Sequence, residues 1–127
     1  MIKKISQKDK IFIAGSTGMV GKAIHRKLLE NNYHNLLTPD RSELNLLDNE
    51  AVTNWFRINK PSVVIIAAAK VGGILANSLN PVEFLLENLK IQINIIENSV
   101  SFRVKRLLFL GSSCIYPKNA TQPIKEE

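Results

Sequence analysis

Two hydroxyls, a thiol and a phenol lie close together near the carboxyl end of the sequence. They follow an apolar run over residues 107–110 and are Ser112, Ser113, Cys114 and Tyr116. Runs this apolar are typical of strands at the centre of a parallel sheet covered on both faces. Polar groups just beyond the carboxyl end of such a strand lie where open α/β sheets bind ligands. The alternative is an ordinary polar transition from strand to loop with a helix cap.

A glycine pattern near the amino end predicts a second part of the same kind of site. Glycines spaced as GxxGxxG lie between an apolar segment, residues 10–14, and an amphipathic segment, residues 18–31. The first glycine permits a tight turn, the second lets the backbone approach a pyrophosphate, and the third lets helix and strand pack closely. The pattern therefore predicts a dinucleotide-binding loop. Its expected cofactor-binding residues are Gly15, Ser16, Thr17, Gly18, Met19, Val20 and Gly21.

A phosphate loop of the GxxxxGK[ST] kind is excluded at this position. Gly21 and Lys22 are present, but Ser16 stands where the first glycine should be, and Ala23 replaces the required Ser or Thr.

The segment 38–42 follows the expected second strand, where such folds select their cofactor. Asp40 could hold a ribose 2′-hydroxyl, whereas Arg41 could hold a 2′-phosphate, and the residues alone leave both open. Asp48 is expected chiefly as the N-cap of the next helix, and it could also reach an adenine.

The apolar patterns predict an α/β fold. Strands are expected at 10–14, 36–37, 62–67 and 105–110, helices at 18–31, 48–58 and 81–102, and a loop at 70–75. This β-α-β-α-β-α-β order predicts about four parallel strands with crossover helices, the N-terminal half of a doubly wound (Rossmann) sheet. Helix 81–102 carries two apolar stripes. Because one stripe is enough to cover a sheet, the second indicates a further partner.

The composition argues against a membrane-spanning, a nucleic-acid-binding and a disulfide-bonded protein. The 127 residues are 45% hydrophobic and 22% charged, as in a single globular domain. No apolar run is long enough to cross a bilayer. Half of the net charge of +6 lies in the first ten residues, without an aromatic-interleaved basic stripe, so neither nucleic acid nor a membrane is an expected partner. The single cysteine excludes an internal disulfide and indicates a reducing cytoplasm.

Four segments together resemble the GDP-L-fucose synthases, a family of extended short-chain dehydrogenases/reductases. They are residues 11–21, 41–48, AAAKVGGI at 67–74 and LLFLGSSCIYP at 107–117, and the last two are the most specific. The resemblance implies an NADPH-dependent enzyme acting on a GDP-sugar. That family epimerises GDP-4-keto-6-deoxy-mannose at C3 and C5 and then reduces the C4 ketone to give GDP-L-fucose.

The resemblance also implies residue roles. Ser112 matches the catalytic serine that hydrogen-bonds the C4 keto oxygen, and Cys114 matches the acid/base for epimerisation. A thiol fits that role because its pKa can be tuned near neutrality. Arg41 matches a residue that binds the 2′-phosphate of NADP(H), although Thr17 stands where the family often has a second arginine. No metal site is predicted. Further cofactor-binding positions are Asn45, Leu46, Asp48, Ala68, Leu110, Gly111 and Ser113.

The same resemblance sets expectations for the whole chain. The family's Tyr-x-x-x-Lys motif does not occur, because neither Tyr33 nor Tyr116 has a lysine four residues later. We therefore expect residues 1–127 to be an NAD(P)-binding domain truncated before that motif and the substrate lobe, and inactive alone. In the family, helix 81–102 builds a homodimer. The alternatives are another nucleotide-sugar epimerase, dehydratase or reductase of the same superfamily, or a non-catalytic NADP-binding module.

Overall fold

Four parallel strands form the centre of the molecule, for which the computed structural model describes residues 4–126, apart from the side chain of Ser113. The strands are β1 (Ile11–Ala14), β2 (Leu36–Leu37), β3 (Val63–Ile66) and β4 (Arg106–Phe109). Their order in the sheet is β2-β1-β3-β4. The chain therefore leaves β1 on one side for β2 and returns on the other side for β3. In open α/β sheets, ligands bind at the carboxyl ends of the two strands that flank such a reversal.

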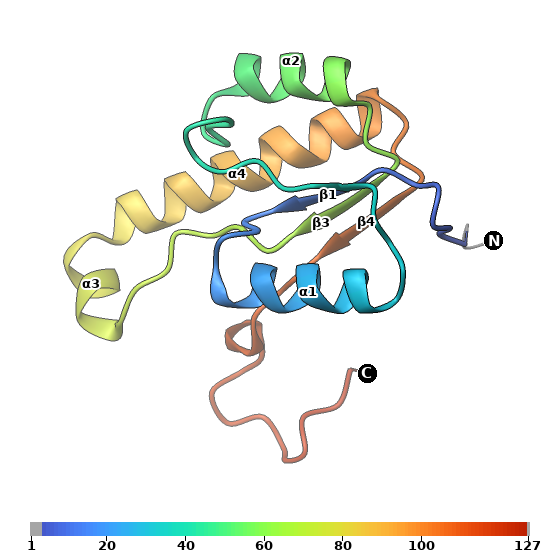
Figure 1. Ribbon diagram of the computed structural model, residues 1–127. Helices are drawn as coiled ribbons and strands as arrows, with labels where there is room; N and C mark the ends of the chain where they lie inside the picture. The colour runs from blue at the N-terminus through green and yellow to red at the C-terminus, as the bar shows by residue number, and fades with distance from the viewer. Residues whose placement is uncertain (1–3, 127) are drawn as a thin grey trace.

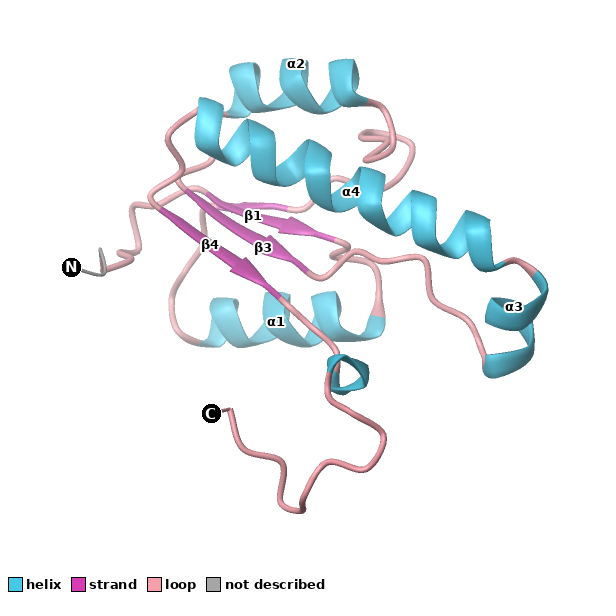
Figure 2. Ribbon diagram, turned by 180° about the vertical axis from the view of Figure 1, so that it is seen from behind, coloured by secondary structure: helices cyan, strands magenta, loops and turns pink. Residues whose placement is uncertain are grey.

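Helices cover both faces of this sheet (Figures 1 and 2). They are α1 (Met19–Glu30), α2 (Asn49–Asn59), α3 (Ile74–Leu79) and α4 (Pro81–Ser101), and a short 3-10 helix spans Ser113–Ile115. Helix α1 lies on one face, whereas α2 and α4 lie side by side on the other. The α/β class, the four strands and three of the helices confirm the sequence-based prediction.

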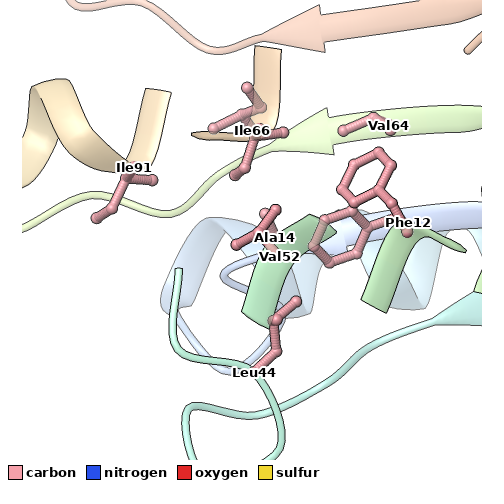
Figure 3. Packing of buried hydrophobic residues seen from close by; sticks show 9 residues of the cluster. Phe12, Ala14, Leu44, Val52, Val64, Ile66 and Ile91 are labelled. Atoms are coloured by element: carbon pink, nitrogen blue, oxygen red, sulfur yellow. The ribbon is translucent and has the colours of Figure 1, made fainter. Parts of the chain in front are cut away.

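The core has one cluster on each face of the sheet. Under α1, alternate strand residues such as Ile11 and Ile13 pack with Ile24 and Leu28 of the helix. Under α2 and α4, the larger cluster contains Phe12, Phe56 and Ile95, none of which is exposed. It also includes Leu44 of the loop before α2 and Ile91 of α4, so the core anchors both of these segments. Figure 3 shows both beside the strand residues Ala14 and Ile66.

An ion pair links the segments that precede β1 and β4, at the amino end of the sheet. Lys105 Nζ donates to Asp9 Oδ2 over 2.5 Å, and Ser62 Oγ donates to Asp9 Oδ1 over 2.9 Å. Burial alone would raise the pKa of Asp9, but hydrogen bonds from Lys105, Ser6 and Ser62 outweigh it and lower the pKa to about 2. This carboxylate therefore joins segments that are far apart in sequence.

Two sequence-based expectations need correction. The segment expected as a loop, residues 70–75, ends in α3, a six-residue helix that begins at Ile74. Strand β4 is not buried, since Leu107, Leu108 and Phe109 are 38%, 49% and 43% exposed. The physical reason is its place at the sheet edge, where it pairs with β3 alone among the described strands.

Helix α4 settles which of the two apolar stripes faces the sheet. Ile91 and Ile95 are buried, together with Asn94 and Asn98. The other stripe is solvent-exposed and consists of Leu85, Leu89, Ile93, Ile96 and Val100. No helix among the described residues is long and apolar enough to cross a membrane.

Candidate functional site

A tight turn joins β1 to α1 and depends on two glycines. Gly15 has a φ of +85°, which side-chain-bearing residues rarely adopt, and a Cβ there would lie 2.7 Å from the backbone nitrogen of Ala68. A Cβ on Gly21 would lie 2.0 Å from the carbonyl oxygen of Gly15. The tight turn at Gly15 and the close packing at Gly21 were predicted from the glycine pattern, whereas the packing of Gly15 against the segment after β3 was not.

Gly18 is different, because its open side faces space rather than protein. A Cβ there would have the carbonyl oxygen of Gly15, at 3.4 Å, as its one neighbour within 4 Å. Gly18 is also the N-cap of α1, and no side chain in the described part of the chain caps this helix. The first-turn N–H groups of a helix attract anions through their hydrogen-bonding capacity and the helix dipole.

A cavity of about 500 Å³ adjoins this turn. Five segments line it: β1 through Phe12 and Ala14, the turn after β1, the loop after β2, the segment after β3 and one side of α4. It lies at the carboxyl edge of the sheet, beside the reversal between β1 and β3. Among the residues predicted to bind a cofactor, those that line it are Gly15, Thr17, Gly18, Arg41, Asn45, Leu46 and Ala68.

Arg41 and Asp40 line the same cavity but have different surroundings. Asp40 Oδ1 accepts hydrogen bonds from the Ser42 side chain and from the backbone N–H groups of Ser42 and Glu43. The Ser42 hydroxyl and these N–H groups lower the pKa of Asp40. Within residues 4–126, Arg41 makes no hydrogen bond or ion pair. Asp40 therefore shapes the loop, whereas the guanidinium of Arg41 is free for a ligand.

A charged cluster that the sequence reasoning missed forms the far wall of the cavity. Lys70 Nζ pairs with Glu83 and, over 2.9 Å, with Glu87 of α4. Hydrogen bonds to Glu83 and then Glu87 raise the pKa of Lys70, and the bond from Lys70 lowers the pKa of Glu87. Lys70 is thus neutralised by two carboxylates. The i, i+4 spacing of Glu83 and Glu87 was the available signal, but nothing local pointed to Lys70 as their partner.

Ser112 and Cys114 lie apart from this cavity, after β4. Ser112 Oγ accepts a hydrogen bond from the backbone N–H of Cys114 over 3.2 Å, and both residues are exposed. The predicted cofactor positions Leu110 and Gly111 adjoin them, and the Ser113 side chain lies outside the described residues. The Ser112 hydroxyl therefore lies against the backbone of Cys114, and both residues are open to a ligand.

The remaining predicted cofactor residues do not line the cavity. Ser16 is buried in the turn, and Asp48 caps α2 by accepting from the backbone N–H of Ala51 over 3.0 Å. The capping role expected of Asp48 is confirmed. The other three lie in the first turn of α1 and are Met19, Val20 and Gly21.

The fold and the glycine turn are those of dinucleotide-binding α/β proteins. Residues 11–127 match the NAD dependent epimerase/dehydratase family, and the chain belongs to this family.

Two curated relatives show how far the similarity extends. GDP-L-fucose synthase 1 of Arabidopsis thaliana is 51% identical over 126 residues, which make up 98% of this chain and 39% of that protein. GDP-L-fucose synthase of Escherichia coli (strain K12) is 50% identical over 119 residues, 94% of this chain and 37% of that protein. The chain thus spans less than two-fifths of the length of these relatives.

A solved structure supports the same fold. MlghC, a GDP-mannoheptose C4 reductase from Campylobacter jejuni with NADP bound, superposes with a TM-score of 0.91 and 38% identity over 96% of this chain and 38% of that chain. The Rossmann-like architecture expected from the sequence is therefore confirmed.

Proposed function

We propose that the chain is the NADP-binding part of a GDP-L-fucose synthase. The main observation behind this proposal is that the glycine turn and Arg41 line one cavity, which lies where the strand order reverses between β1 and β3. A Cβ has no room at Gly15 or Gly21, whereas Gly18 is open to a ligand. Identities of about 50% with GDP-L-fucose synthases support the choice of reaction.

In this proposal different residues of the cavity bind different parts of NADPH. The turn at 15–21 holds the pyrophosphate through backbone N–H groups at the start of α1. Arg41 holds the 2′-phosphate by a charge-assisted hydrogen bond. Asn45, Leu46 and Ala68 contact the adenosine half, and residues 110–113 extend the site along the carboxyl edge of the sheet.

Ser112 and Cys114 carry the sugar chemistry in the proposal. Bound NADPH supplies the hydride that reduces a C4 ketone. Ser112 Oγ–H donates to the keto oxygen, which orients and polarises it. The Cys114 thiolate removes a proton from carbon adjacent to the ketone on one face, and a second acid/base group on the opposite face must supply the proton that completes the epimerisation. A ketone acidifies the neighbouring C–H bonds, so a thiolate can remove such a proton.

A second candidate is a C4 reductase of another GDP-sugar that does not epimerise. The 38% identity and the TM-score of 0.91 with the GDP-mannoheptose C4 reductase favour it. The two candidates share the cofactor site and differ in whether Cys114 exchanges protons with the sugar.

Helix α4 provides the proposed subunit contact. Its stripe of exposed apolar residues runs from Leu85 to Val100, and Leu85 and Val100 are 60% and 74% exposed. We propose a homodimer through this face and a GDP-sugar as the other partner, with neither nucleic acid nor a membrane involved. A cytoplasmic location follows from the same proposal, because Cys114 must remain a reduced thiol.

The experiment uses the protein expressed from its complete gene, GDP-4-keto-6-deoxy-mannose and NADPH in deuterium oxide. Cys114→Ser should abolish deuterium incorporation at the sugar carbons while the C4 ketone is still reduced. Ser112→Ala should slow reduction about 10²-fold, in the range of a lost transition-state hydrogen bond. Unchanged deuterium incorporation in Cys114→Ser would assign the cysteine a structural role, whereas reduction without deuterium incorporation in the unmodified protein would favour the second candidate.

A further inference from the structure

Two asparagines of α4 tie the loops on either side of the cavity to the helix. Asn88 Oδ1 accepts from the backbone N–H of Lys70 over 2.8 Å, and its Nδ2 donates to the Lys70 carbonyl over 3.0 Å. Asn94 Nδ2 donates to the carbonyl of Leu46 over 2.9 Å, and its Oδ1 accepts from Asn49 Nδ2 over 3.0 Å. Each asparagine therefore bonds to the backbone of one loop from a position on the same helix, and Asn94 also bonds to the first residue of α2.

The two tethered residues lie on different walls of the cavity. Lys70 belongs to the segment after β3, and Leu46 belongs to the loop that follows β2. These strands flank β1 in the sheet, so the two loops lie on either side of the glycine turn. Glu87, which directly precedes Asn88, and Ile91, which comes between the two asparagines in sequence, line the cavity themselves. Helix α4 thus lines the cavity and also holds two other segments that line it, the loop after β2 and the segment after β3.

Replacing Asn88 or Asn94 should release only the loop to which that asparagine is hydrogen-bonded. Asn94 is 7% exposed, and the loop it holds is also anchored in the core by Leu44, with Leu46 and Leu47 packed against the same cluster. Asn88 makes a two-point contact with a single residue, which holds the two peptide groups on either side of the Lys70 Cα. Asn98 provides a contrast on the same helix, because its Nδ2 donates to the carbonyl of Asn94 and to neither loop.

We propose that Asn88 and Asn94 are positioning residues of the cofactor site, which hold its two loop walls at the separation that binding requires. The inference rests on the proposed binding of NADPH. A loop released from its tether populates the binding-competent arrangement for only a fraction of the time, and the apparent dissociation constant rises by the inverse of that fraction. If a tether contributes about 1.4 kcal/mol, its removal weakens binding about tenfold.

The test compares Asn88→Ala, Asn94→Ala and Asn98→Ala in the protein expressed from its complete gene. Three quantities are measured: the dissociation constant for NADPH, the thermal midpoint, and amide hydrogen exchange in the cofactor-free protein. We expect Asn88→Ala to accelerate exchange at 67–73 alone and Asn94→Ala to do so at 44–49 alone. Each should raise the dissociation constant for NADPH about tenfold. Asn98→Ala should lower the thermal midpoint but leave NADPH binding within about twofold.

The inference is wrong if the loops exchange faster while NADPH binds as before, or if Asn98→Ala weakens binding as much as the other two. Unchanged exchange in both loops would equally overturn it. If Asn94→Ala does not fold, Asn88→Ala at its half-buried position decides the question. Failure of the unmodified protein to bind NADPH would reject the proposed function instead, and the exchange data would still show whether the asparagines hold the loops.

Discussion

Alanine at three glycines should separate the packing role of the glycine turn from its ligand-binding role. At Gly21 the added Cβ meets the carbonyl oxygen of Gly15 at 2.0 Å and two more backbone atoms within 2.8 Å. Alanine gains about 1 kcal/mol over glycine inside a helix. Overpacking costs about 1–3 kcal/mol, and contact with unyielding backbone lies at the upper end of that range or above it. We expect a net loss of about 2 kcal/mol in the free energy of unfolding.

The other two glycines supply the contrast. At Gly18 a Cβ meets a single atom at 3.4 Å, and at Gly73 it meets nothing within 4 Å. Neither Gly18→Ala nor Gly73→Ala should therefore lower stability. Gly18→Ala should nevertheless weaken NADPH binding at least tenfold (about 1.4 kcal/mol), because its methyl group occupies the open side of the turn.

Urea unfolding and NADPH titration of the three variants measure both effects. With an m-value of about 2 kcal/mol per molar, the loss at Gly21 lowers the urea midpoint by about 1 M. Gly73→Ala serves as the matched control and should leave the midpoint and the affinity unchanged. An unaltered midpoint in Gly21→Ala, or full NADPH affinity in Gly18→Ala, would refute the reasoning.

Three further predictions concern charge and assembly. Arg41→Ala should reduce the preference for NADPH over NADH, and equal affinities in the unmodified protein would show that Arg41 does not bind the 2′-phosphate. Because the pKa of Asp9 is lowered to about 2, its ion pair with Lys105 stabilises the fold fully above pH ~4, and this contribution of about 1–2 kcal/mol disappears as the pH falls towards 2. In Asp9→Asn the urea midpoint should therefore depend less on pH between pH ~4 and ~2. An equally steep pH dependence in this variant would show that Asp9 does not cause it. Leu89→Glu on the exposed stripe of α4 should convert a dimer to monomer in sedimentation, and a dimer that persists would remove this face as the contact.

Local patterns predicted the parts of this molecule that local chemistry determines. The glycine spacing predicted the turn because steric demands on Gly15 and Gly21 act within a few residues. Asp48 could be expected to cap α2 because an N-cap bonds to an N–H three residues later. The apolar strands were equally clear, since four consecutive buried residues form each of β1 and β3.

Features that depend on distant partners could not be predicted in this way. Lys70 meets Glu87 17 residues later, and Asn94 meets Leu46 48 residues earlier. The apolar pattern of α4 showed two stripes but not which of them faces the sheet. The burial of β4 was overestimated for a similar reason, because hydrophobicity of a strand does not specify its neighbours. Helix α3 escaped prediction because six residues after two glycines carry little periodic signal.

The most direct test of the proposed function is the product formed from GDP-4-keto-6-deoxy-mannose and NADPH in deuterium oxide. The protein expressed from its complete gene should oxidise NADPH and yield GDP-L-fucose that carries deuterium at C3 and C5, as judged by NMR and mass spectrometry. A reduced sugar without deuterium would contradict the epimerase assignment and favour a simple C4 reductase. No oxidation of NADPH would contradict the proposed enzymatic function altogether.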